Sequence, residues 1–195
     1  MTPSRIGILG GTFDPVHIGH MAIAQKALEK CRLDKVIFVP SALPPHKKIP
    51  RLASARDRYQ MVALATRGNP RFEVSDYEIQ KGGKSYSVDT VRHFREIYPA
   101  ETKLFFIVGE DNVDTLETWK EIDRIVEIVT FIVVNRPGFR HHQKKIKFQS
   151  VMLPGMDISS SYLRRAIGQG KTIKYLIPDK VLEYIEQNQL YKIDK

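Results

Sequence analysis

The sequence predicts an α/β fold in which one doubly wound, parallel sheet fills a single domain of residues 1–195. Two observations predict it. Short apolar runs alternate with helical patterns along the whole chain, and glycine-rich or polar segments directly follow several of these runs. Such alternation produces parallel strands covered by helices on both faces. Ligands of these sheets bind beyond the carboxyl ends of the strands, so the segments that follow the strands are the first candidates for a site.

Short apolar runs bounded by turn residues are the candidate strands. They are residues 6–9, 36–39, 72–74, 77–79, 104–108 and 129–134, with a weaker strand around Val151. Apolar residues at helical spacing define the candidate helices. They are residues 19–30, a segment that Ser54 can cap, residues 87–98, segments after Asp111 and two helices that close the chain. A doubly wound sheet built from these elements is Rossmann-like.

The composition is that of a globular protein with an excess of positive charge. Of the 195 residues, 42% are apolar and 27% are charged, and 31 basic against 22 acidic residues give a net charge of +9. Nucleic acid and small polyanionic substrates both fit this charge. No aromatic-interleaved module or zinc knuckle accompanies the basic residues, which favours a small anion over a nucleic acid.

Three further features bear on where the protein works. No apolar run is long enough to span a membrane, and the N-terminus lacks the apolar stretch of a secretory signal. The single cysteine, Cys31, excludes an internal disulfide and is interpreted as a packing or surface residue. We therefore expect a cytoplasmic protein with no membrane partner. A homo-oligomer is compatible with the sequence, which leaves the oligomeric state open.

The segment 9–20 reads LGGTFDPVHIGH and directly follows the first candidate strand. Gly10 and Gly11 let backbone N–H groups approach a phosphate without an intervening Cβ, and the helix that follows points its positive dipole end at the same place. His17 and His20 are three residues apart, so they share a face of the helix start and can hold one anion together. The segment predicts a site for a phosphate on which charge accumulates during a reaction.

Each part of this segment also has a simpler explanation. Gly-Gly turns are common, and two histidines are often one surface residue and one residue bonded to a backbone carbonyl. A zinc site with two histidine ligands is a further alternative, but no cysteine or acidic cluster at ligand spacing completes it. The strand, the turn and both histidines occur together and in order, which favours the phosphate site. No side chain is predicted to be a metal ligand.

Two motifs near opposite ends of the chain resemble those of the nucleotidylyltransferase superfamily. The early motif is GTFDPVHIGH at residues 11–20, and the late motif is ISSSYLR at residues 158–164. Segments between them resemble one branch, the bacterial nicotinate-nucleotide adenylyltransferases. These segments are Pro44 to Lys47, Ser85 to Ser87 with Asp89 and Thr90, Gly109 to Asp111, Leu116 with Trp119, and Arg136 to Gly138.

The resemblance implies adenylyl transfer, with ATP and nicotinate mononucleotide as the substrates. The mononucleotide phosphate would attack the α-phosphorus of ATP, forming deamido-NAD and expelling pyrophosphate. A phosphate oxygen is already anionic, so no nucleophile has to be generated, and positioning and electrostatics should supply most of the catalysis. Mg²⁺ is expected as a largely hydrated ion on the substrate phosphates, because no cage of carboxylates is visible.

The resemblance also assigns residues to ATP. His17 and His20 are the expected catalytic donors to the α- and β-phosphates in the transition state, and Arg164 adds a bidentate clamp. The other expected ATP contacts are Gly10, Gly11, Thr12, Phe13, Gly109, Asp111, Ile158, Ser159 and Ser160. Several of these have a structural alternative. Phe13 can pack under the turn, and Asp111 and the serines can be ordinary helix N-caps. For the neighbouring Asp14 we expect a structural role.

Three residues are expected to contact the mononucleotide. Lys47 resembles the basic residue of the family that meets the substrate phosphates, and its alternative is a solvated loop. Trp119, the only tryptophan, is expected to stack on the pyridine ring, and its alternative is core packing. Ser87, with neighbouring backbone amides, is expected to hold the carboxylate. It stands where the family usually has threonine, and Glu110 stands where small residues are common.

Other functions remain open at this point. Another adenylyltransferase of the superfamily, such as the phosphopantetheine enzyme, shares the chemistry, but it carries Thr-Asn-Gly-His where this chain has residues 16–20, Val-His-Ile-Gly-His. A cytidylyltransferase would need an arginine-rich late motif that this chain lacks. A non-catalytic nucleotide- or nucleic-acid-binding module would use the positive charge, and the presence of both histidines and Arg164 argues against it.

Overall fold

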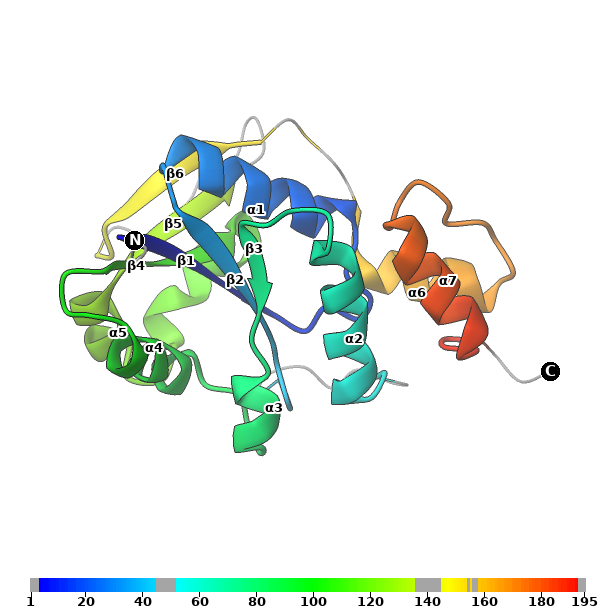
Figure 1. Ribbon diagram of the computed structural model, residues 1–195, viewed down its shortest axis with the longest axis horizontal. Coiled ribbons are helices and arrows are strands. Elements are labelled where there is room, and N and C mark those ends of the chain that lie inside the picture. The colour runs from blue at the N-terminus through cyan, green and yellow to red at the C-terminus, as the bar shows by residue number, and fades with distance from the viewer. Residues whose placement is uncertain (1–3, 45–51, 136–144, 154, 156–157, 193–195) are drawn as a thin grey trace.

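The computed structural model describes residues 4–44, 52–135, 145–153, 155 and 158–192. Its strands are β1 (Arg5–Gly11), β2 (Lys35–Pro40), β3 (Phe72–Val74), β4 (Lys103–Gly109), β5 (Val129–Asn135) and β6 (Phe148–Met152). They form one six-stranded sheet in the order β3-β2-β1-β4-β5-β6, and every neighbouring pair is parallel. The expected α/β class with a doubly wound, Rossmann-like sheet is confirmed (Figure 1).

Helices connect the strands and lie on both faces of the sheet (Figure 1). They are α1 (Ile18–Lys30), α2 (Ala55–Thr66), α3 (Tyr77–Lys81), α4 (Ser87–Ile97), the 3₁₀ helix η1 (Glu110–Thr118), α5 (Ile122–Ile128), α6 (Ser160–Gly168) and α7 (Asp179–Gln187). Ser54 caps α2 as expected, because its hydroxyl accepts the backbone N–H of Asp57 at 3.0 Å.

Two hydrophobic cores result, one on each face of the sheet. The first lies beneath α1 and α2 on one face and continues into α6 and α7, where α7 packs against α2, with residues such as Leu28, Val62 and Leu163 fully buried. The second packs α4, η1 and α5 against the other face, through residues such as Val91 and Leu116. Parallel strands buried on both faces explain why their sequences are continuous apolar runs rather than alternating ones.

The strand order fixes where a ligand can bind. The chain runs from β1 to β2 and β3 on one side, and then crosses to β4 on the other side of β1. Between β1 and β4 the strand order therefore reverses, and ligands of such sheets bind at this switch point. The register pairs Gly11 with Pro40 and Gly109 with Val134, so the carboxyl ends of these central strands lie at one edge.

One predicted strand is wrong. Residues 77–79 were expected to be extended, but they belong to the short helix α3. The helical turn brings Glu78 into a buried position, where its carboxylate accepts the hydroxyl of Thr90 at 2.5 Å. It also lets Gln80 reach back to the carboxylate of Asp76, four residues earlier. These contacts outweigh the strand preference of Tyr77 and Ile79.

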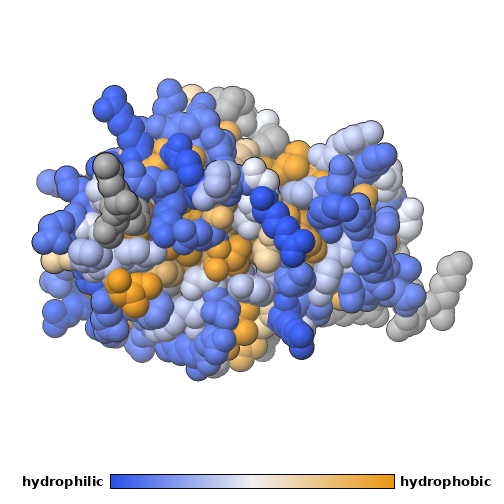
Figure 2. Space-filling model, in the orientation of Figure 1, coloured by the Kyte–Doolittle hydropathy of each residue, from blue (hydrophilic) through white to orange (hydrophobic). Residues whose placement is uncertain are grey.

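Surface and packing agree with the composition. The face in Figure 2 is mainly hydrophilic, with separate smaller patches of hydrophobic residues. Cys31 is buried in the first core and forms no disulfide, which agrees with a packing role. Among the described residues, no helix combines the length and the apolar composition needed to cross a membrane.

Candidate active site

The loop that leaves β1 is held close to the sheet by its own phenylalanine. Phe13 has a positive φ of 51° and is only 2% exposed. Its ring lies so close to Gly11 that a Cβ there would stand 2.9 Å from the ring, which is why glycine is needed at this position. Phe13 therefore packs beneath the loop, as its structural alternative predicted, and its side chain does not line the surface.

The two histidines of the early motif lie against each other at the start of α1. His17 is the N-cap residue, and the ring centroids of His17 and His20 are 3.7 Å apart. A Cβ at Gly19 would stand 2.9 Å from Nδ1 of His17, so the glycine makes room for this ring. The predicted pairing of His17 and His20 on one face is what the geometry gives.

One hydrogen bond selects the tautomer of the neutral His20 ring. The backbone N–H of His17 donates to Nδ1 of His20 at 3.2 Å. Nδ1 is therefore an acceptor without a proton, and in the neutral ring the proton is on Nε2. The ring also meets the edge of Phe13, with centroids 5.0 Å apart. His20 thus has a fixed orientation and a defined donor atom.

His17 is the more buried of the two histidines. It is 5% exposed, and its Nδ1 has no hydrogen-bond partner among the described residues. Burial lowers the pKa of His17 from 6.5 to about 4, because the charged imidazolium loses its hydration. At neutral pH His17 is therefore an uncharged imidazole that can donate or accept a hydrogen bond without adding a formal charge.

This burial predicts an acid-sensitive contribution to stability. The unfolded chain binds a proton at His17 below pH 6.5, and the folded chain binds it only near pH 4, so stability falls as the pH drops between these values. Between pH 7 and pH 5 we expect the wild type to lose about 2 kcal/mol more unfolding free energy than His17→Asn. Urea denaturation of both proteins at the two pH values measures this. Equal losses in the two proteins would contradict it.

The late motif is brought against the early one. Ser159 is the N-cap of α6, and its hydroxyl accepts the N–H of Tyr162 at 3.2 Å, which is the structural role considered for it. The hydroxyl of Ser160 donates to the carbonyl oxygen of Pro15 at 3.0 Å. The start of α6 therefore lies beside the loop after β1, although the two segments are far apart in the sequence. Ile158 packs against the core just before it.

Arg164 lies at the same junction, but it is engaged with the protein. Its guanidinium donates to the carbonyl oxygen of Asp14 at 2.6 Å and forms an ion pair with Oδ2 of Asp14 at 3.3 Å. A second hydrogen bond goes to the hydroxyl of Ser161 at 3.2 Å. A guanidinium carries five donors, so these contacts leave others for a ligand.

Behind the loop lies a buried polar cluster that the sequence analysis missed. Oδ1 of Asp14 accepts the N–H of Ala53 at 3.1 Å and the hydroxyl of Tyr191 at 2.7 Å. Burial and the Asp14 carboxylate raise the pKa of Tyr191, so the hydroxyl stays protonated as a donor. Asp14 is 1% exposed, and these contacts match the structural role expected for it.

Arg58 completes this cluster from α2. It has no exposed surface, and its guanidinium donates to three backbone carbonyls, those of Ala53 at 3.1 Å, Thr12 at 2.9 Å and Ala42 at 2.9 Å. Arg58 thus ties the loop after β1 to the loop after β2. Its position in an otherwise ordinary amphipathic helix gave no signal of this role, since charged residues are rarely fully buried.

Gly109 and Asp111 follow β4 on the other side of the switch point. A Cβ at Gly109 would stand 2.7 Å from Oδ1 of Asp111, so the carboxylate lies directly over the glycine. Asp111 belongs to the first turn of η1, whose N-cap is Gly109. The N-cap alternative for Asp111 is therefore wrong. Its carboxylate is exposed and accepts one hydrogen bond, from Asn112 at 3.0 Å.

Of the residues expected near the mononucleotide, Trp119 packs against aromatic side chains of β4 and β5. Trp119 meets the rings of Phe106 and Phe131 edge-on, with centroids 5.7 and 6.1 Å away, and it remains partly exposed. Phe106 in turn lies next to Gly10, where a Cβ would stand 3.4 Å from its ring. Ser87 is the first residue of α4. Lys47 lies outside the described residues.

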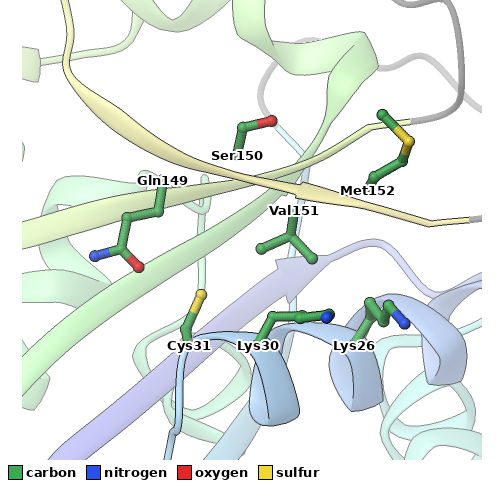
Figure 3. Close-up of a pocket in the computed structure, with 7 residues that line it drawn as sticks. All are labelled: Lys26, Lys30, Cys31, Gln149, Ser150, Val151 and Met152. Carbon is green, nitrogen blue, oxygen red and sulfur yellow. The ribbon is translucent and has the colours of Figure 1, made fainter.

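No group of three or more histidine, cysteine or acidic side chains in the described ranges is arranged to hold a metal ion. The two-histidine zinc alternative therefore gains no third protein ligand there. A groove of about 670 Å³ lies elsewhere, between α1 and the edge strand β6 (Figure 3). It is lined by Lys26, Lys30, Cys31, Gln149, Ser150, Val151 and Met152, and it contains no predicted site residue.

A doubly wound sheet with a glycine loop, two histidines and a serine-capped helix at its switch point defines a nucleotide-binding transferase of the Rossmann-like class. The cytidylyltransferase-like family model matches residues 8–166. This range contains both the early motif and the late motif, which together form the candidate site.

Comparison with individual proteins specifies the branch. The chain is 43% identical to a probable nicotinate-nucleotide adenylyltransferase of Moorella thermoacetica, and the alignment covers 97% of this chain and 93% of the relative. It is 44% identical to one from Shouchella clausii, with 96% of each chain covered. The chain belongs to the nicotinate-nucleotide adenylyltransferase family.

A solved structure supports the fold independently. The Plasmodium falciparum nicotinic acid mononucleotide adenylyltransferase complexed with NaAD has a TM-score of 0.81, with 96% of this chain and 97% of that chain covered. The two sequences are 22% identical, so this likeness shows the fold and not the residues of the site.

Proposed function

We propose that this chain transfers the adenylyl group of ATP to nicotinate mononucleotide, giving deamido-NAD and pyrophosphate. The observation that carries the proposal is the contact between His17 and His20 beside the glycine loop, at the switch point of the sheet. The relatives with 43% and 44% identity are named for this activity, and the pairing supplies the chemistry that it requires.

The reaction brings two polyanions together and adds charge to the oxygens of the α-phosphate. Nε2 of His20 donates to these oxygens, since its other nitrogen is occupied by the N–H of His17. His17 donates to the adjoining phosphate as an uncharged ring. Donors held in a fixed orientation lose little reorganisation energy when charge develops, and this is the largest expected source of catalysis.

The rest of ATP is held by backbone groups and one clamp. The N–H groups of Gly10, Gly11 and Thr12 line the phosphates, and Phe13 contributes only through its backbone. At the start of α6, the amides after Ile158, including those of Ser159 and Ser160, attract the β- and γ-phosphates with the helix dipole. Arg164 adds its remaining donors to the same phosphates.

The ribose end of ATP and the pyridine end of the acceptor bind on the β4 side of the switch point. The backbone at Gly109 allows close approach of the nucleotide, and Asp111 accepts hydrogen bonds from ribose hydroxyls. Trp119 stacks on the pyridine ring, Ser87 binds its carboxylate, and Lys47 meets the substrate phosphates. The acceptor phosphate then attacks in line, and pyrophosphate leaves on the opposite side.

Mg²⁺ enters this reaction as the counter-ion of ATP. The donor set near the phosphates consists of backbone amides, imidazoles and a guanidinium, which suits anions rather than a bare cation. A hydrated ion bound to the phosphates themselves fits this environment, and the protein residues act on the phosphates directly.

ATP labelled at the α-phosphorus tests the proposal. Incubation with MgATP and nicotinate mononucleotide should move the label into a dinucleotide and release unlabelled pyrophosphate. No label should remain on the protein after denaturation, because the acceptor oxygen attacks directly. Label bound covalently to the protein would contradict direct transfer, and a complete lack of labelled dinucleotide would contradict the function.

Trp119→Ala should raise KM for the mononucleotide about tenfold, because one base–aromatic stack is lost. KM for ATP should stay nearly unchanged, since the tryptophan lies on the acceptor side. Steady-state kinetics with each substrate varied in turn measures the two KM values separately. Trp119→Phe keeps an aromatic face and should recover most of the loss. Equal increases in both KM values would mean that Trp119 acts only through its packing on Phe106 and Phe131.

A further inference from the structure

We propose that the side chain of Lys120 selects nicotinate mononucleotide over nicotinamide mononucleotide by pairing with the pyridine carboxylate. The inference rests on the proposed function and deepens it. Three observations carry it: the position of Lys120 beside Trp119, the contact of its ammonium with Tyr86, and the pairing of the neighbouring carboxylates with other cations.

Lys120 directly follows the residue proposed to stack on the pyridine ring. Trp119 packs on Phe106, and Phe106 lies next to Gly10, near the end of β1. Only one aromatic ring therefore separates Trp119 from Gly10, one of the residues proposed to line the phosphates. A mononucleotide whose phosphate reaches this loop and whose ring reaches Trp119 would present its ring substituent near Lys120.

The ammonium of Lys120 is held above Tyr86. Its Nζ lies 4.7 Å from the centroid of the Tyr86 ring, which is a cation–π contact. Tyr86 is the N-cap of α4 and immediately precedes Ser87, the residue proposed to bind the carboxylate. The cation–π contact thus places a positive charge next to the residue that precedes Ser87 in the sequence.

The acidic neighbours of Lys120 are paired with other cations. Glu117 pairs with Lys145 at 3.3 Å, and Glu121 pairs with Arg92. Lys120 itself forms no ion pair with a carboxylate in the described part of the chain. Its charge is therefore not compensated locally, and an anionic ligand can use it.

Charge separates the two candidate acceptors. Nicotinate carries a carboxylate where nicotinamide carries a neutral amide, so a nearby ammonium attracts the first and not the second. Lys120 is exposed, and an ion pair of this kind changes binding by about fivefold rather than by orders of magnitude. Lys120 therefore acts as a specificity-determining residue and not as a catalytic one.

Lys120→Met tests this with MgATP saturating and each mononucleotide varied. We expect kcat/KM for nicotinate mononucleotide to fall about fivefold, with kcat/KM for nicotinamide mononucleotide and KM for ATP unchanged. Lys120→Arg should restore most of the preference. Added salt should weaken the preference of the wild type and leave that of Lys120→Met unaffected.

Lys174→Met is the matched control, because Lys174 is also exposed and lies over a tyrosine ring, with its Nζ 5.3 Å from the centroid of Tyr175. It should keep the wild-type preference. A Lys120→Met enzyme that keeps the full acid-over-amide ratio would overturn the inference while leaving the proposed function intact. A wild type that uses neither mononucleotide would instead overturn the proposed function.

Discussion

Replacing His20 by alanine should lower turnover about a hundred- to a thousandfold while leaving the affinity for ATP nearly unchanged. The reason is the fixed geometry of the ring. The N–H of His17 holds Nδ1 of His20, and the ring of Phe13 packs against the ring of His20. Nε2 is the proposed donor to the oxygens that gain charge. A donor used mainly in the transition state contributes to kcat rather than to ground-state binding.

Single-turnover kinetics and ATP titration of the same His20→Ala protein measure the two effects separately. His93→Ala is the matched control, since His93 is also a partly buried helix residue stacked on an aromatic ring, that of Tyr77 at 3.8 Å, outside the proposed machinery. It should retain wild-type turnover. A His20→Ala enzyme with most of its rate would remove His20 from the mechanism.

Replacing Arg58 by methionine should destabilise the protein by about 3 kcal/mol or more. Methionine fills a similar volume, but it leaves the carbonyls of Thr12, Ala42 and Ala53 buried without their donors. It also removes a positive charge that interacts with the buried carboxylate of Asp14, and the charge of Asp14 opposes the lowering of the Arg58 pKa by burial. The loops after β1 and β2 lose their shared anchor, so we also expect lower turnover in the folded protein.

Chemical denaturation measures the loss of unfolding free energy. Steady-state kinetics at denaturant concentrations well below the unfolding midpoint measures the loss of turnover. Arg56→Met is the control, because Arg56 lies on the same helix but is exposed, and it should change stability by less than about 0.5 kcal/mol. Arg58→Lys keeps the positive charge but not the planar set of guanidinium donors. Its loss of unfolding free energy should lie between those of Arg56→Met and Arg58→Met. Similar stability of Arg58→Met and Arg56→Met would contradict the anchoring role.

Most of the fold could be predicted because its signals are local. The runs at β1, β2, β4 and β5 are buried on both faces, so each is a continuous apolar segment in the sequence. Residues 77–79 had a comparable β-forming composition, but their conformation depends on Glu78 reaching Thr90. That contact joins residues 12 positions apart, and no local pattern announces it.

The candidate site likewise contains local contacts that the sequence predicts and long-range contacts that it does not. The pairing of His17 with His20 follows from helical spacing, and it could be predicted from three residues of separation. The contact of Tyr191 with Asp14 spans 177 residues, and that of Arg164 with Asp14 spans 150. Such contacts depend on the tertiary fold. Asp14 therefore could be assigned a structural role from its motif, but its partners could not be named.

The measurement that tests the central claim most directly is pyrophosphate release from MgATP with single acceptors. Nicotinate mononucleotide, nicotinamide mononucleotide and 4′-phosphopantetheine are offered separately, and the dinucleotide product is identified by mass. Our account predicts rapid release with nicotinate mononucleotide, slower release with nicotinamide mononucleotide and none with 4′-phosphopantetheine. Preference for another acceptor would contradict the roles given to Ser87, Trp119 and Lys120, and absence of release with all three would contradict the catalytic roles of His17 and His20.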